Sequence, residues 1–159
     1  MTVAIYPGRF DPVTAGHIDI VTRSSVLFEK VVISVFDAPE GQTLFTTKER
    51  VALFGDAVKD LKNVSVQSFT GLVVDCAHQA GAKAIVRGIR MNADFEYEFE
   101  MALMNRRLAP DIDVVCLMTD IRYQFVRASL IKEVSRLGGD IKGLAPAKVI
   151  AALHQRFNN

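Results

Sequence analysis

Five short apolar runs alternate with longer helix-like segments along this chain, and this alternation limits the fold more than any other feature. The runs span residues 3–6, 31–36, 64–69, 84–86 and 114–118. Strands that are separated by helices pair in parallel, because each crossover returns the chain to the same end of the sheet. Such crossovers are right-handed and place helices on both faces. The sequence therefore predicts an α/β fold: a Rossmann-like, doubly wound, parallel five-stranded sheet with helices on both faces.

Helix start signals locate several of the connecting helices. Thr46 and Glu49 have the spacing of a capping box and open a helix that we expect to run to about Leu61. We expect the longest helix over 92–108, another over 128–137, and a last amphipathic stretch that begins at Pro146. At 159 residues the chain can bury one core without disulfides or structural metal, so we expect a single domain over 1–159.

Charge and cysteine usage exclude several classes of protein. The formal net charge is only +1, so nothing attracts the whole chain to nucleic acid or to an anionic membrane, and any affinity for phosphate must be local. Cys76 and Cys116 lie far apart and outside any Cys-x-x-Cys pair. We find no leader segment and no apolar run of membrane-spanning length. We therefore expect a cytoplasmic protein with no nucleic-acid and no membrane partner.

The loop after the first apolar run has the composition of an anion site. Gly8 allows the backbone to pass close to a ligand, and Asp11 with the following proline favours a turn. Thr14 can cap a helix whose first turn carries His17. The free N–H groups and the dipole of a helix start attract phosphate, and a histidine there can donate one more hydrogen bond.

Other residues that suit phosphate follow the fourth and fifth runs. Arg87 and Arg90 bracket a glycine directly after the fourth run, which favours bidentate phosphate binding over two solvated arginines. Segment 123–129 follows the fifth run and enters a helix, whose start binds phosphate through its backbone whether or not Ser129 takes part. Because the carboxyl ends of parallel strands meet at one edge, we expect these segments to join His17 in one site.

The longest expected helix carries a polar stripe, and familiar site motifs are absent from the chain. Glu98 and Asn105 share a face with Met101, and either could contact a ribose or a base, although most of the face should be packing. Phe10 is expected to be a core residue beneath the loop. The sequence has no G-x-x-x-x-G-K-[ST], no G-x-G-x-x-G after the first run, no G-x-S-x-G and no metal-ligand spacing, so we predict no protein-held metal.

Several motifs in combination resemble one family. Gly8-x-Phe10-Asp11-Pro12 with Thr14-x-Gly16-His17 is similar to the signature of the nucleotidylyltransferase superfamily. Together with Phe45-Thr46, Glu49-Arg50-Val51 and four further segments it resembles the bacterial phosphopantetheine adenylyltransferases over essentially the whole chain. Those segments are Arg87-Gly88-Ile89-Arg90, Asp94-Phe95-Glu96-Tyr97-Glu98, Met104-Asn105-Arg106 and Ser129-Leu130-Ile131-Lys132-Glu133-Val134.

The resemblance implies a nucleotidylyltransferase-type sheet and transfer of AMP from ATP to 4′-phosphopantetheine, with Mg²⁺ on the phosphates. It implies that His17 stabilises the transition state, that the chains assemble as homohexamers and that coenzyme A feeds back as an inhibitor. It implies acceptor contacts at Arg9, Gly41, Val73 and Arg87. It implies ATP contacts at Arg9, Phe10, His17, Gly88, Ile89, Arg90, Glu98, Tyr123, Gln124, Phe125, Val126, Arg127, Ala128 and Ser129.

Three positions depart from the family pattern. Arg9 replaces a threonine or serine, Gly41-Gln42 replaces a lysine-rich stretch, and Arg127-Ala128 replaces two residues of a serine run. The first and third departures add a positive charge, and the second removes one. We therefore expect Arg9 or Arg127 to reach the phosphate that the absent lysine would have held, because a guanidinium is long and binds bidentately.

Two alternatives stay open at this point. The first is a sister nucleotidylyltransferase with another acceptor, such as nicotinamide mononucleotide, or glycerol 3-phosphate with CTP. The second is a non-catalytic nucleotide-sensing module that has kept the fold, which the altered Arg9 and Gly41-Gln42 positions would suit. A tRNA synthetase is disfavoured, because 159 residues leave no room for a tRNA-binding domain.

Overall fold

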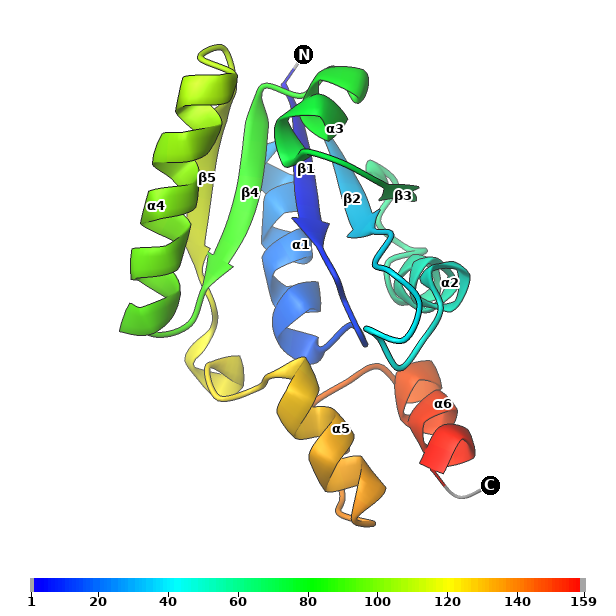
Figure 1. Cartoon of the computed structure of the whole chain (residues 1–159). Coiled ribbons are helices and arrows are strands. Elements are labelled where there is room, and N and C mark those ends of the chain that lie inside the picture. Colours follow the sequence, from blue (N-terminus) through cyan, green and yellow to red (C-terminus); the bar gives the residue numbers. More distant parts are fainter. Residues whose placement is uncertain (1, 158–159) are drawn as a thin grey trace.

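The computed structural model describes residues 2–157, and for Asn92 and Ala93 only the backbone. It contains one parallel five-stranded sheet in the order β3-β2-β1-β4-β5, which confirms the predicted fold class (Figure 1). The strands are β1 (Val3–Gly8), β2 (Lys30–Phe36), β3 (Val64–Phe69), β4 (Ala84–Ile89) and β5 (Asp113–Met118). The helices are α1 (Ala15–Leu27), α2 (Thr47–Ala57), α3 (Val73–Gln79), α4 (Asn92–Leu108), η1 (Ile121–Tyr123), α5 (Ala128–Arg136) and α6 (Ala147–Phe157).

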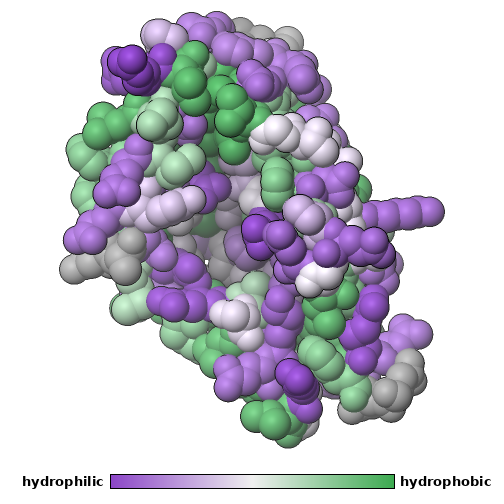
Figure 2. All heavy atoms as spheres, viewed as in Figure 1, coloured by the Kyte–Doolittle hydropathy of each residue, from purple (hydrophilic) through white to green (hydrophobic). Residues whose placement is uncertain are grey.

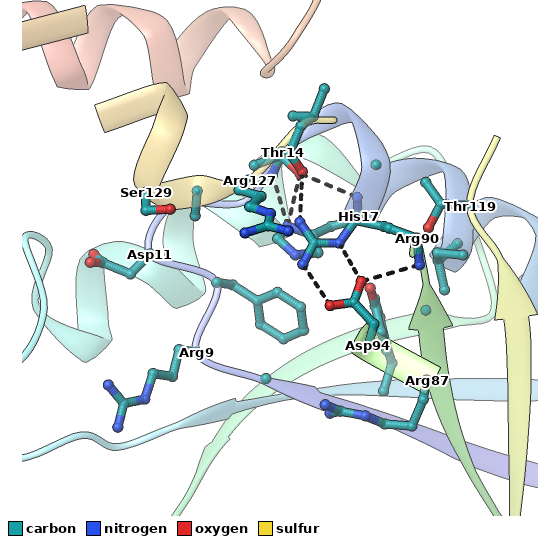
Figure 3. A pocket seen from close by; sticks show the side chains of 18 of the residues that line it. Arg9, Asp11, Thr14, His17, Arg87, Arg90, Asp94, Thr119, Arg127 and Ser129 are labelled. Atoms are coloured by element: carbon teal, nitrogen blue, oxygen red, sulfur yellow. Dashed lines mark hydrogen bonds and ion pairs between the residues drawn. The ribbon is translucent and has the colours of Figure 1, made fainter. Parts of the chain in front are cut away.

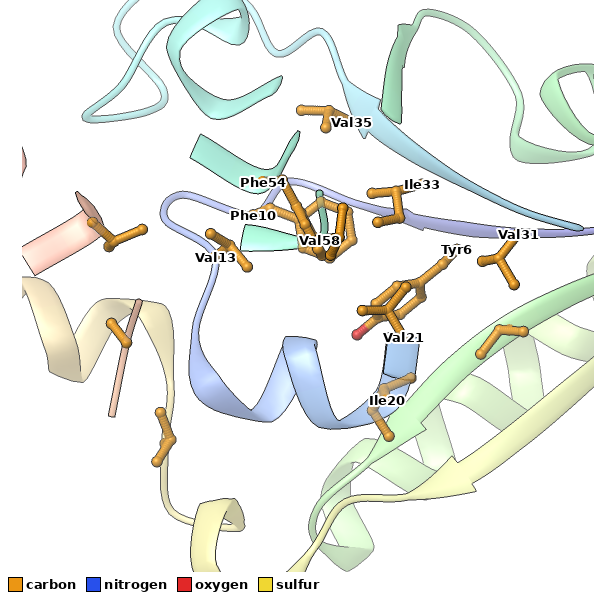
Figure 4. Packing of buried hydrophobic residues seen from close by; sticks show 14 of the residues in the cluster. Tyr6, Phe10, Val13, Ile20, Val21, Val31, Ile33, Val35, Phe54 and Val58 are labelled. Atoms are coloured by element: carbon orange, nitrogen blue, oxygen red, sulfur yellow. The ribbon is translucent and has the colours of Figure 1, made fainter. Parts of the chain in front are cut away.

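Helices cover both faces of the sheet, and each face has its own hydrophobic core. One core joins the sheet to α1 and α2 through Ile20 and Phe54, and it continues to Val149 of α6 (Figure 4). The other joins the opposite face to α3 through Val74 and Ala77. Figure 1 shows α5 and α6 beyond the carboxyl ends of the strands, below the sheet in this view. No helix in the described part of the chain is both long enough and apolar enough to cross a membrane.

The predicted boundaries agree with the structure at the strongly patterned elements. The third strand and the longest helix have the predicted limits, and Thr46 caps α2 with a reciprocal Glu49 bond. The helix from Thr46 ends at Ala57 rather than near Leu61. The prediction that Arg87, Gly88 and Ile89 follow the fourth strand is wrong, because they lie inside β4 and pair with 116–118 of β5. Arg87 can occupy this strand because Glu98 on α4 forms an ion pair with it.

Candidate functional site

A cleft of about 440 Å³ opens at the carboxyl ends of β1 and β4. These two central strands lead to connections on opposite sides of the sheet, which is where ligands bind in doubly wound folds. Figure 2 shows hydrophilic side chains gathered along the middle of this face, where the surface is hollowed. The cleft is lined by the loop after β1, the start of α1, the end of β4, residues 42–43 and the start of α5.

His17 is the third residue of α1 and forms part of its N-terminal cap. The Thr14 backbone N–H donates to His17 Nδ1 at 3.0 Å, while the His17 backbone N–H donates to Thr14 Oγ1 at 3.5 Å (Figure 3). Because Nδ1 accepts a hydrogen bond, the neutral ring carries its proton on Nε2. The helix start therefore fixes both the orientation of the ring and its tautomer. This leaves one N–H donor on a residue that lines the cleft.

Electrostatics keep that ring neutral. Burial lowers the pKa of His17 to about 4, with additional lowering from the positive charges of Arg90 and Arg87. The Phe10 ring packs edge-on against the imidazole at 5.0 Å between centroids and is itself only 5% exposed, as expected for a core residue. A Cβ at Gly8 would lie 2.7 Å from that phenyl ring, so only glycine leaves Phe10 in place. Gly8 and Phe10 therefore help to hold the His17 ring in position.

Arg87 connects β4 to α4. Its Nε and Nη2 donate to the two carboxylate oxygens of Glu98 at 2.7 and 2.6 Å, and its Nη1 donates to the Pro7 carbonyl at 2.8 Å. Burial alone would lower the pKa of Arg87, but the hydrogen bonds and the charge of Glu98 outweigh it and raise the pKa. The Arg87 guanidinium is therefore held in one position, and both carboxylate oxygens of Glu98 accept hydrogen bonds from it.

Arg90 is held by a second carboxylate. Its Nε donates to Asp94 Oδ2 at 3.1 Å and its Nη1 to the Val126 carbonyl at 3.2 Å. The second of these bonds connects the end of β4 to the segment that leads into α5. Val126, Arg127, Ala128 and Ser129 all line the cleft, as predicted for this helix start.

A buried carboxylate connects the loop after β1 to two other elements. Asp11 accepts from the backbone N–H groups of Leu44 and Phe45, both at 2.9 Å, and from Lys132 Nζ of α5 at 2.7 Å. Arg50 is 1% exposed and donates to the carbonyls of Arg9 at 2.7 Å and Phe36 at 2.9 Å. Asp11 and Arg50 together fix the loop and residues 44–45 to each other.

An apolar groove adjoins the cleft on the far side of Arg87. It has a volume of about 110 Å³, and Pro7, Arg87 and Glu98 line both cavities. Val73 of α3 lies on the groove, as do Tyr97, Met101 and Asn105 of α4. Glu98, Met101 and Asn105 therefore lie on one face of α4, as predicted. Asn105 lies on the apolar groove and not in the cleft. A site with an arginine-rich half and a narrow, mainly apolar half suits a ligand that joins an anionic group to an extended arm.

Of the predicted site residues, Val73 lies on the apolar groove, and the others fall into two groups in the structure. The cleft brings together Arg9, Phe10, His17, Arg87, Gly88, Arg90, Glu98, Val126, Arg127, Ala128 and Ser129. Gly41, Ile89, Tyr123, Gln124 and Phe125 lie outside its lining, where Gln42 and Thr43 take the place expected for Gly41, and Tyr123 faces another cavity behind α1. The roles of the residues in both groups stay predictions.

Sequence reasoning missed two charged residues that build the site. Lys132 and Arg50 both belong to motifs quoted above, but the sequence predicts no role for either side chain. A signal existed for Lys132, which follows Ser129 by three residues and so shares its helix face. No local pattern marks Arg50, since the carbonyls to which it donates are 5 to 41 residues away. Among residues 2–157, no group of three His, Cys, Asp or Glu side chains is placed to hold a metal ion.

Comparison with known proteins identifies the family. Residues 5–134 match the cytidylyltransferase-like family model. The chain is 51% identical over 157 residues to phosphopantetheine adenylyltransferase of Thermomicrobium roseum, covering 97% of this chain and 94% of that protein. It is 46% identical over 159 residues to the protein of the same name from Clostridium tetani, covering 100% of this chain and 99% of that protein.

A solved structure shares the fold at low identity. The bifunctional NMN adenylyltransferase/ADP ribose pyrophosphatase of Francisella tularensis superposes with a TM-score of 0.74 and 16% identity, over 99% of this chain and 50% of that one. This likeness concerns the fold alone, whereas the near-complete alignments above set the family. The chain belongs to the phosphopantetheine adenylyltransferase family, within the cytidylyltransferase-like proteins.

Proposed function

We propose that this protein transfers AMP from ATP to 4′-phosphopantetheine, giving dephospho-coenzyme A and pyrophosphate, and that His17 stabilises the transition state. The observation that carries the proposal is the fixed Nε2–H of a neutral His17 at a helix start, in a cleft that also holds Arg87 and Arg90. The adjoining groove with Val73 and Asn105 offers space for the pantetheine arm.

The chemistry needs positioning more than acid–base catalysis. The attacking group is a phosphate monoester that is already anionic near pH 7, so neither a general base nor a covalent intermediate is required. The barrier lies in bringing two polyanions together in line while charge builds on the oxygens of the α-phosphate. In the proposed mechanism the His17 Nε2–H donates to one of these oxygens. Arg90, the α1 start and the α5 start bind the phosphates of ATP, and Arg87 orients the acceptor.

Mg²⁺ would enter this site on the ATP phosphates. The carboxylates nearest to the cleft are already used, since Asp11 accepts from Lys132, Asp94 from Arg90, and Glu98 from Arg87. These residues suit a metal held mainly by substrate oxygens and water better than a protein-held ion. A bound Mg²⁺ would supply charge neutralisation on the phosphates.

Assembly, regulation and location complete the proposal. We expect homo-oligomers, with the hexamer that the resemblance implies, because α4 exposes Phe95, Phe99, Leu103 and Leu108 to more than half of their area. Coenzyme A, which extends the reaction product, would act as a feedback inhibitor at the same cleft. The enzyme would work in the cytoplasm, where its ATP substrate is made.

The test is pyrophosphate release from ATP and Mg²⁺ with each acceptor offered separately. We expect release with 4′-phosphopantetheine and none with nicotinamide mononucleotide or with glycerol 3-phosphate and CTP. His17→Ala should lower kcat by ~10²- to 10³-fold, the usual loss for one transition-state donor. His154→Ala, on the exposed surface of α6, is the matched control and should keep kcat. Near-normal turnover by His17→Ala would reject the mechanism, and no release with any acceptor would favour a nucleotide sensor.

A further inference from the structure

The segment 119–127 joins the edge strand β5 to α5 and forms the side of the cleft that takes ATP in the proposed function. Thr119 and Val126 line the cleft. The pairing of β5 with β4 ends at Met118. In the described part of the chain, one backbone bond then connects the segment to the sheet, from the Thr119 N–H to the Ile89 carbonyl at 2.8 Å. The sheet alone therefore does not fix the segment, and other contacts must position it.

Two side chains of α1 hold the backbone on both sides of Thr119. The Asp120 N–H donates to Asp19 Oδ2 at 3.1 Å, and Arg23 Nη2 donates to the same oxygen at 2.9 Å. The same Arg23 nitrogen donates to the Met118 carbonyl. We call Asp19 and Arg23 the α1 clamp. The Asp19 side chain is only 14% exposed, so these charge-assisted bonds form largely away from solvent, where they are stronger than at the surface.

The α1 clamp acts on the cleft without touching it. Asp19 and Arg23 line the cavity behind α1, whereas Thr119 lines the cleft. Thr119 is 5% exposed and lies between α1 and β4, because a Cβ at Gly16 or at Gly88 would lie within 4 Å of its side chain. A change in either residue of the clamp would therefore reach a ligand only through the position of Thr119 and the segment that follows it.

One helix carries both the clamp and the candidate catalytic residue. His17 lies in the first turn of α1, and the clamp lies on the next turns of the same helix, so the clamp sets the position of Thr119 relative to His17. The segment continues to Val126, whose carbonyl accepts from Arg90 at 3.2 Å. Figure 3 shows Thr119 and Arg90 at the end of the cleft away from Arg9. The clamp therefore belongs to the ATP side of the cleft.

We propose that Asp19 and Arg23 are positioning residues that hold Thr119 and the segment after β5 against α1, and so set the affinity for ATP but not for the acceptor. This inference rests on the proposed function. A segment that is already fixed when ATP arrives loses little conformational entropy on binding, whereas a loosened segment must be ordered by the ligand and so weakens the affinity. The proposed acceptor contacts, Arg87 and the apolar groove, do not involve this segment.

Steady-state kinetics of single variants separates this role from a general loss of structure. Asp19→Asn keeps an oxygen that can accept from Asp120 but removes the charge that pairs with Arg23. It should raise KM for ATP by about 3- to 20-fold. It should leave kcat within about threefold and KM for 4′-phosphopantetheine within about twofold, because His17 and the groove stay in place.

Variants of the second residue test whether the pair acts as one unit. Arg23→Gln should raise KM for ATP in the same way, and Arg23→Lys should recover part of the loss. The double variant Asp19→Asn/Arg23→Gln should be no worse than the worse single variant, because one Arg23 nitrogen makes both of its bonds. Fully additive effects would show that the two residues act separately and would contradict the clamp.

Asp56→Asn is the matched control, because Asp56 of α2 pairs with Lys148 of α6 and does not line the cleft. It should keep all three kinetic constants. If Asp19→Asn behaves like Asp56→Asn, or if it impairs kcat and both KM values alike, the inference is wrong. Calorimetric titration of ATP with Mg²⁺ into the whole protein tests the inference without turnover. If Asp19→Asn weakens ATP there but the unaltered protein transfers no AMP, the proposed function fails and the positioning role stands.

Discussion

At the scale of single residues, the protonation of His17 decides what the cleft offers to a phosphate. Its pKa is lowered from 6.5 to about 4, so the folded protein keeps the ring neutral over a range in which the unfolded chain binds a proton. The contribution of this group to stability is therefore complete above about pH 6.5 and is lost as the pH falls toward 4. The Nε2–H remains available throughout this range.

We expect the His17 ring to show no titration between pH 8 and about 5 in NMR spectra of histidine-labelled protein, with His17→Gln used to assign its signal. Any loss of kcat/KM near pH 6 should then follow the second ionisation of the acceptor phosphate, whose pKa is about 6, rather than the enzyme. A His17 signal that titrates near 6.5 would contradict the neutral-donor mechanism.

At the scale of elements, periodicity and capping signals were enough for the sheet, the long helix and the His17 helix start. They failed where a local pattern depends on distant partners. The charge of Arg87 predicts that the fourth strand ends before it. In the structure Arg87 lies inside β4, because Glu98 on α4 pairs with its charge. The sequence contains no start signal for helix α3, because its seven residues begin at Val73 and the N-cap residue Leu72 makes no side-chain cap. The resemblance implies an ATP contact at Glu98, but the sequence does not show that Glu98 accepts two hydrogen bonds from Arg87. The two residues lie on different elements, β4 and α4.

Arg50 shows how strongly the elements around the loop depend on one such partner. Its guanidinium donates to the carbonyls of Phe45, Arg9 and Phe36 and to the Thr47 hydroxyl. Arg50→Met would remove all four of these hydrogen bonds from a buried position, and we expect the free energy of unfolding to fall by about 3 kcal/mol or more.

Urea unfolding followed by circular dichroism measures this loss. Lys48→Met, on the exposed side of the first turn of α2, is the control and should stay within about 0.5 kcal/mol of the unaltered protein. If Arg50→Met is as stable as Lys48→Met, the loop does not depend on this guanidinium.

At the scale of the whole molecule, α4 exposes several large apolar side chains. Phe95, Phe99, Leu103 and Leu108 are each 51 to 57% exposed, and Met118 at the end of the edge strand β5 is 74% exposed. Exposed apolar side chains that gather on one helix mark an association surface more often than a solvated one. A second copy of the chain is the partner that the expected homohexamer requires.

We therefore expect multi-angle light scattering to give the mass of several chains for the unaltered protein and a smaller mass for Leu103→Asp, because a carboxylate buried in an apolar interface without a partner is costly. Val26→Asp places the same charge on α1, where the replaced side chain is 84% exposed and lies apart from α4, so this control should keep the mass of the unaltered protein. If the unaltered protein is a monomer at micromolar concentration, Leu103 contacts only water and the expectation is wrong. If Leu103→Asp and Val26→Asp have the same mass, assembly does not use α4. If Leu103→Asp separates the chains but keeps the affinity for ATP, each subunit holds a complete nucleotide cleft, as the lining from a single chain leads us to expect.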